Sequence, residues 1–172
     1  VTESDMAIAM ARSGGIGIVH RFLTVERQVA EVTRVKRAEA LVIPDPHTVR
    51  PDATLAEARA EMARHGVTGL VVTDGDGRLA GLLTRRDEML QDDPAIPVRD
   101  LMTPRARLVT GSAATTSDEA ARLLRDARVE KLPLVDADDR LVGLITLRDL
   151  LQRAERPEAT KDERGRLAVG AA

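Results

Sequence analysis

Hydrophobic and polar residues follow two rhythms along the chain, a helical spacing and a strand-like alternation, in an order that occurs twice. Residues 54–66 open with the capping box TLAE, carry apolar residues at helical spacing and end at a glycine, which predicts a helix. Residues 67–73 are rich in β-branched residues, 74–77 (DGDG) suit a hairpin turn, and 79–83 predict the returning strand. Thr84 then begins a second helix.

The same unit returns 62 residues later without a gap. Residues 67–87 (VTGLVVTDGDGRLAGLLTRRD) and 129–149 (VEKLPLVDADDRLVGLITLRD) are identical at 11 of 21 positions. A unit of about 50 residues is marginal alone, so the repeat predicts a pseudo-symmetric pair around one core. The predicted elements of the second copy are a helix start at Thr116, strands at 129–135 and 141–145, a turn at 136–139 and a helix from Thr146. Short extended pieces, Thr48-Val49 and Leu108-Val109, precede the two helices.

The segments outside the repeat contain a few helix and strand patterns that do not make up a complete domain. Residues 6–12 predict a helix, 14–19 a turn into a buried strand, and 25–38 an amphipathic helix capped by Thr24. One face of that helix carries Val25, Val29, Val32 and Val35. Residues 166–172 turn apolar as the chain stops. Partial elements on both sides of a complete pair indicate a repeat domain inserted into a host domain.

Composition narrows the function further. Phe22 is the only aromatic residue and the net charge is −2, which argues against stacking on single-stranded nucleic acid and against a field that attracts nucleic acid or membranes. The chain has no cysteine, and its histidines (His20, His47, His65) lack metal-ligand spacing, so no metal site is predicted. No apolar run spans a bilayer and no signal peptide is recognised, so a cytoplasmic protein is expected. Because it begins at Val1 and not Met, we expect a fragment.

Four segments carry a resemblance to known families. The repeat pair resembles a tandem CBS (Bateman) module, and the flanks resemble bacterial inosine-monophosphate (IMP) dehydrogenase and its relative guanosine-monophosphate (GMP) reductase. The segments are VTESDMAIAMARSGGIGIVH (1–20), MTPRARLVT (102–110), RVEKLPLVD (128–136) and ATKDERGRLAVGAA (159–172).

The resemblance implies a mixed α/β (α+β) fold in which two CBS repeats pack as a pseudo-twofold Bateman module, flanked by fragments of a TIM barrel. The implied boundaries are barrel material at 1–41, a first repeat at 42–97 (copy one), a second at 98–153 (copy two) and a return into the barrel at 154–172. Without the rest of that barrel, we expect Ile8, Ile16, Ile18, Val29 and Val32 to lie uncovered.

For function, the resemblance implies a purine-nucleotide-sensing regulatory pair of an IMP dehydrogenase, whose parent reaction is the NAD-dependent oxidation of IMP to XMP in guanine nucleotide synthesis. The family's chemistry uses a loop cysteine and an arginine-bearing flap, and a barrel needs about 250 residues. We therefore expect no catalytic residue here and no activity of this chain alone. Self-association through CBS pairs, into tetramers or octamers of the parent, is implied as well. Two alternatives remain: the module of a GMP reductase, and a purely structural dimerisation module.

The pattern T-x-x-D begins the second helix of both copies, at Thr84 with Asp87 and at Thr146 with Asp149. As simple helix caps such residues stabilise the fold by about 1 kcal/mol. Their hydroxyl and the free backbone N–H groups also suit a phosphate, and the carboxylate suits a ribose. The resemblance adds that CBS modules use these positions for adenosine nucleotides, which predicts ATP in at least one cleft and a guanine or second adenine nucleotide in the other.

Lys131 is one of three lysines and lies inside a strand-like apolar run. It is either an edge-strand lysine that blocks aggregation or, as in similar modules, a cationic clamp on polyphosphate. Its counterpart is Gly69, so copy two holds the greater positive charge. The arginines next to the T-x-x-D residues, Arg85, Arg86 and Arg148, either add to this charge or form a solvated helix face.

Overall fold

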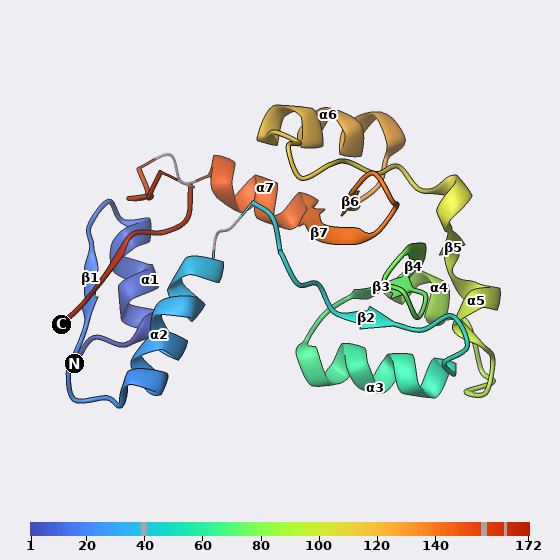
Figure 1. Cartoon of the computed structure of the whole chain (residues 1–172), viewed down its shortest axis with the longest axis horizontal. Coiled ribbons are helices and arrows are strands. Elements are labelled where there is room, and N and C mark those ends of the chain that lie inside the picture. The colour runs from blue at the N-terminus through green and yellow to red at the C-terminus, as the bar shows by residue number, and fades with distance from the viewer. Residues whose placement is uncertain (39–40, 156–157, 164) are drawn as a thin grey trace. The chain divides into compact units, whose positions relative to one another are not determined.

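The computed structural model of the chain describes residues 1–38, 41–155, 158–163 and 165–172, which fall into two compact units (Figure 1). One unit combines both ends of the chain, residues 1–43 and 145–172, and the other contains residues 44–144. Helices and strands mix in both units, so the predicted mixed α/β class is confirmed. The finer boundaries at residues 41, 97 and 153 stay a prediction.

The unit of the two chain ends is built on a parallel pair of strands from distant parts of the sequence. Strand β1 (Gly17–Val19) pairs with β8 (Val169–Ala171), and helices α1 (Ser4–Arg12) and α2 (Val25–Arg37) pack beside them. A Cβ on Gly17 would lie 2.5 Å from the Cα of Ala7, so only glycine allows α1 this close to β1. The buried residues of this core are Ala7, Ala11, Val35, Ala159 and Leu167.

Much of the apolar surface of this unit is exposed. Thr24 caps α2 as predicted, accepting a hydrogen bond from the Arg27 N–H at 3.4 Å. Of the four valines on the helix face only Val35 is buried, while Ile16, Ile18 and Val29 are more than half exposed, as expected for uncovered residues. Ile8 and Val32, expected to be uncovered too, are half-buried. The predicted buried strand is therefore only half correct: Gly17 and Val19 point inward and Ile18 points outward.

Copy one supplies three strands of a four-stranded sheet and the helix packed against it, and residues 103–104 of copy two supply the fourth strand (Figure 1). Strand β2 (Thr48–Val49) runs parallel to β3 (Gly69–Thr73), which is antiparallel to β4 (Leu79–Thr84), and β4 is antiparallel to β5 (Thr103–Pro104). Helix α3 (Leu55–His65) begins at the predicted capping box, in which the Glu57 carboxylate accepts from the Thr54 N–H at 2.7 Å. The core consists of Val49, Ala58, Met62, Leu70, Val72, Leu83 and Val98.

Copy two repeats the helix–strand–strand order of copy one, with a two-stranded sheet and one difference from the prediction. Helix α6 (Ser117–Ala127) precedes the strand pair β6 (Lys131–Val135) and β7 (Leu141–Thr146). The sequence predicts the extended piece before α6 at Leu108-Val109, but in the structure the parallel bridge to β6 joins Gly111 to Leu134. Val49 pairs with Val72 in copy one, and the residues 62 positions later are Gly111 and Leu134. The repeat itself therefore predicts the observed register.

At the start of copy two, two short helices lie before and after β5 in the sequence. They are α5 (Val98–Leu101) and the 3₁₀ turn η1 (Arg105–Arg107). The Arg105 guanidinium holds η1 to the hairpin of copy two, donating from Nε and Nη2 to the Asp139 carboxylate at 2.8–3.0 Å.

The hairpin turns of the two copies bind each other reciprocally. The Leu79 N–H donates to the Asp139 carbonyl at 2.9 Å, and the Leu141 N–H donates to the Gly77 carbonyl at 3.0 Å. The side chain of Arg78 donates to the Asp138 carbonyl and, in the same way, that of Arg140 to the Asp76 carbonyl. Each contact has its counterpart 62 residues away, which relates the hairpins by a pseudo-twofold axis.

The second helices of the two copies differ in length, which the sequence did not reveal. Helix α4 (Arg85–Glu88) is a single turn, whereas α7 (Leu147–Ala154) runs for two. The Arg59 side chain on α3 binds the Glu88 carboxylate at 2.6 Å and the carbonyls of Glu88 and Gln91 at 2.7 and 2.9 Å, which ends α4. Nowhere in the described part of the chain is a helix long and apolar enough to cross a membrane.

Candidate functional site

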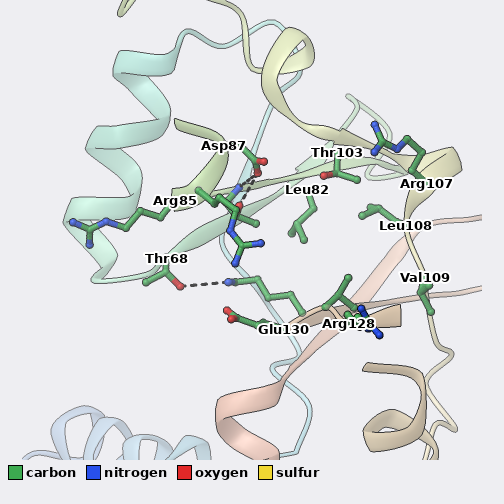
Figure 2. A pocket seen from close by; sticks show the side chains of 14 residues that line it. Thr68, Leu82, Arg85, Asp87, Thr103, Arg107, Leu108, Val109, Arg128 and Glu130 are labelled. Carbon is green, nitrogen blue, oxygen red and sulfur yellow. Dashed lines mark hydrogen bonds between the residues drawn. The ribbon is translucent and has the colours of Figure 1, made fainter. Parts of the chain in front are cut away.

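A cavity of about 280 Å³ lies between copy one and copy two, inside the unit of residues 44–144 (Figure 2). Copy one contributes the end of β4 and the turn α4, and copy two contributes the segment after η1 and the start of β6. The lining residues include five predicted ones, Thr84, Arg85, Arg86, Asp87 and Lys131.

Thr84 and Asp87 bind each other at the start of α4. The Asp87 carboxylate accepts from the Thr84 N–H at 2.8 Å and from the Thr84 hydroxyl at 2.6 Å, both through Oδ2. Among the described residues, none donates to Oδ1 of Asp87, so one carboxylate oxygen remains available to a ligand. Both residues are half-buried. Because α4 is only one turn long, its backbone dipole supplies little of the anion binding that was predicted for a helix N-terminus.

Lys131 reaches from copy two onto copy one. Its ammonium donates to the Thr68 hydroxyl at 3.3 Å, the lower dashed line in Figure 2. Its side chain crosses Gly69, where an added Cβ would lie 3.1 Å from the Lys131 Cε and 2.9 Å from the Leu83 carbonyl oxygen. Gly69 is the counterpart of Lys131 at the offset of 62, so glycine in one copy makes room for lysine in the other.

The cavity is strongly basic. Five of its lining side chains are cationic and two are anionic; they are Arg85, Arg86, Arg107, Arg128 and Lys131 against Asp87 and Glu130. The sequence analysis missed Arg107, Arg128 and Glu130. A residue-by-residue comparison of the copies points to the two arginines, because their counterparts in copy one are Asp45 and Gly66. Such a lining favours an anion that carries several charges.

The remaining lining residues give the cavity an apolar side. They include Leu82 from β4, Leu108 and Val109 after η1, and Val129 before β6. Figure 2 shows Leu82 and Leu108 among the side chains that line the cavity. An aliphatic surface beside a polyanion site suits a ligand with one flat apolar part and one highly charged part.

The other predicted residues do not line this cavity. Thr146, Arg148 and Asp149 belong to the unit of the chain ends, and there the Thr146 hydroxyl donates to the Asp149 carboxylate at 2.5 Å and accepts from the Asp149 N–H at 3.2 Å. Their contacts reproduce a helix cap, and a ligand role for them stays a prediction. Across the residues the structure describes, no three His, Asp or Glu side chains gather into a group that could hold a metal ion.

Comparison with known proteins identifies the family. The model of the IMP dehydrogenase / GMP reductase domain matches residues 1–172. The chain belongs to the IMP dehydrogenase / GMP reductase family. The inosine-5'-monophosphate dehydrogenases of Mycobacterium tuberculosis (strain H37Rv) and Methanocaldococcus jannaschii are 49% and 44% identical over 172 residues, all of this chain. The chain spans 32% and 34% of those relatives, about a third of their length.

Solved structures of the family superimpose closely on the chain. GMP reductase from Trypanosoma brucei, in complex with guanosine 5'-triphosphate, matches with a TM-score of 0.87 and 37% identity. The match covers 99% of this chain and 42% of the reductase. A structure of that reductase's C318A variant with guanosine 5'-monophosphate gives a TM-score of 0.88 at 37% identity, covering 99% of this chain and 37% of the variant. The chain therefore resembles the IMP dehydrogenases in sequence and GMP reductase in both sequence and fold.

Proposed function

We propose that the chain is the purine-nucleotide-sensing regulatory part of an IMP dehydrogenase, a tandem CBS (Bateman) pair with adjoining segments of a TIM barrel. The observation that carries the proposal is the basic cavity in which Thr84 and Asp87 of copy one meet Lys131 of copy two. The reciprocal hairpin contacts support the pseudo-twofold pair. The parallel pairing of β1 with β8 across the repeats supports insertion into a host domain.

In this proposal the nucleotide binds with its ribose on Asp87 and its phosphates near Thr84 and Lys131. The Asp87 oxygen that Thr84 leaves available accepts from the ribose hydroxyls, and the lining cations neutralise the phosphates. The aliphatic side of the cavity, which includes Leu82 and Val109, covers the base. ATP or a guanine nucleotide has the combination of charge and apolar surface that this lining fits. Asp149 and Thr146 would serve a second nucleotide.

The parent protein would oxidise IMP to XMP with NAD, and its CBS pairs would associate between tetramers into octamers. This chain has no cysteine to serve as the family's nucleophile, so we expect it to reduce no NAD when IMP is added. A GMP reductase is the second candidate parent, because the reductase with guanosine 5'-triphosphate shares the fold at a TM-score of 0.87. Identities of 44–49% to the dehydrogenases, against 37% to the reductase, favour the dehydrogenase.

Calorimetric titration of the chain with ATP, GTP and AMP tests the proposal. Two charge-assisted bonds to a ribose predict that D87A lowers affinity about 30- to 150-fold. D126A removes an exposed acid of α6 outside the cavity and is the matched control, expected to bind as the parent does. D149A shows whether a second nucleotide is bound. If no nucleotide binds below millimolar concentration, or if D87A binds like the parent, the pair is a structural dimerisation module instead.

A further inference from the structure

Arg128 adopts a backbone conformation that its residue type disfavours. It ends α6 with φ +55°, in the left-handed region, as Gly66 ends α3 with φ +63°. For a side chain with a Cβ this region costs about 1 kcal/mol or more, and glycine escapes the cost. The hydrogen bonds of the two helix ends are equivalent, Val129 N–H to the Leu124 carbonyl and Val67 N–H to the Met62 carbonyl, both at 3.0 Å. The fold therefore needs the turn and not the arginine.

The guanidinium of Arg128 also makes no hydrogen bond or ion pair that would stabilise the described part of the fold. The arginines at the hairpin contact are held by protein groups: Arg78 and Arg140 bind the opposite hairpin, and Arg105 binds Asp139. Among the residues that the structure describes, none forms a hydrogen bond or ion pair with the Arg128 side chain, which lines the cavity at its lower edge in Figure 2. A residue that strains the backbone and binds nothing in the protein is expected to serve a ligand.

The charge of the cavity indicates which part of a ligand Arg128 meets. Its neighbours along copy two, Arg107 and Lys131, are cations whose counterparts in copy one are Asp45 and Gly69, as the counterpart of Arg128 is Gly66. Asp87 and Thr84 belong to copy one, so ribose and first phosphate lie there in the proposed binding mode. Phosphates beyond the first extend toward copy two, where these three cations stand.

We propose that Arg128 is the specificity-determining residue that makes this cavity select nucleoside triphosphates over monophosphates. The inference rests on the proposed nucleotide site and adds to it the ligand class. The guanidinium of Arg128 binds the phosphates beyond the first, and a monophosphate has no phosphate that reaches it. The backbone strain at position 128 is kept because glycine, which fits the turn better, carries no charge.

The test compares substitutions that separate the turn from the charge. R128G and R128N both tolerate a left-handed backbone and remove the guanidinium, and R128K keeps a cation on a strained backbone. We expect R128G and R128N to weaken ATP binding about 10- to 30-fold and AMP binding less than 3-fold in calorimetric titrations, with R128K in between. The ligand-free melting temperature of R128G should equal or exceed that of the parent, since relief of strain offsets the extra freedom of glycine when unfolded.

R122A, which removes an exposed arginine of α6 outside the cavity, is the matched control and should bind both nucleotides like the parent. If the parent binds ATP and R128G binds it equally well, the role of Arg128 is refuted while the nucleotide site stands. An equal loss of ATP and AMP affinity would also refute it, because it would show a general effect on the cavity. If the parent binds neither nucleotide, the proposed function itself has failed.

Discussion

Copy one and copy two have similar backbone conformations at equivalent positions but carry different side chains there. At the two left-handed positions of the repeat, copy one has Gly66 and Gly77 and copy two has Arg128 and Asp139, with φ between +55° and +78° in all four. Copy one shows that glycine satisfies the fold. The charged residues of copy two strain the backbone and serve other purposes, the cavity for Arg128 and the ion pair with Arg105 for Asp139.

The difference is also complementary in space. Lys131 lies across Gly69, its own counterpart, so the two equivalent positions share one space near the pseudo-twofold axis and cannot both carry long side chains. Sequence asymmetry between the copies thus adds three cations of copy two to a cavity that copy one lines with Arg85 and Arg86, and Gly69 leaves room for the side chain of Lys131. A pair of identical copies would lack the room for it.

The largest effect is expected where that shared space is filled. G69A places a Cβ 2.9 Å from the Leu83 carbonyl oxygen and 3.1 Å from the Lys131 Cε, so backbone and lysine must both move. We expect a loss of about 2 to 3 kcal/mol in the free energy of unfolding, measured by urea denaturation, together with weaker ATP binding.

The matched control is G75A in the exposed hairpin turn, where a Cβ would meet nothing within 4 Å. It should change stability by less than about 0.5 kcal/mol. Equal effects of G69A and G75A would show that Lys131 does not depend on the glycine beneath it.

A smaller effect on stability is expected at the end of α4, which Arg59 holds in copy one and which has no equivalent contact at the counterpart residues of copy two. Arg59 ends α4 through Glu88, whereas the counterparts of these residues in copy two are Ala121 and Leu150. R59A should lower the free energy of unfolding by about 1.5 to 2 kcal/mol, since it frees two carbonyls and a half-buried carboxylate. Hydrogen exchange should increase in residues 88–91. R64A, which breaks an exposed pair with Glu61, is the control and should leave this segment protected.

Local signals predicted most of the fold. The capping box at Thr54, the glycine end at Gly66 and the hairpin turn at 74–77 involve residues within a few positions of each other, and all three occur as expected. The repeat predicted the second set of elements. The register at Gly111 was missed because Leu108-Val109 looks more strand-like, and Leu108 is indeed extended without pairing.

The cavity was predicted only in part, because its second half depends on contacts across about 60 residues. Thr84, Asp87 and Lys131 carry recognisable patterns. Arg107 and Arg128 appear as ordinary surface arginines until the pairing of the copies brings them to the same cavity. The short α4 was missed for the same reason, since Arg59 is distant in sequence from the carbonyls it binds.

The smallest effect concerns the second charged residue at a left-handed position and depends on pH. The Arg105 guanidinium holds the pKa of the Asp139 carboxyl below its ordinary value, and Asp139 in turn raises the pKa of Arg105. A lowered carboxyl pKa in the folded state contributes stability that is present above the ordinary pKa, about 3.9, and is lost as pH falls through the lowered one.

Asparagine tolerates the left-handed backbone, so D139N removes the charge without adding strain. We expect D139N to melt about 2 °C or less below the parent at pH 6 to 7, with the gap closing below pH 4 and shrinking in high salt. D138N, at the exposed tip of the same hairpin, should show neither the gap nor its pH dependence. A gap for D139N that stays constant from pH 3 to 7 would mean that the carboxylate charge contributes nothing, and the ion pair would then leave the backbone strain at Asp139 unexplained.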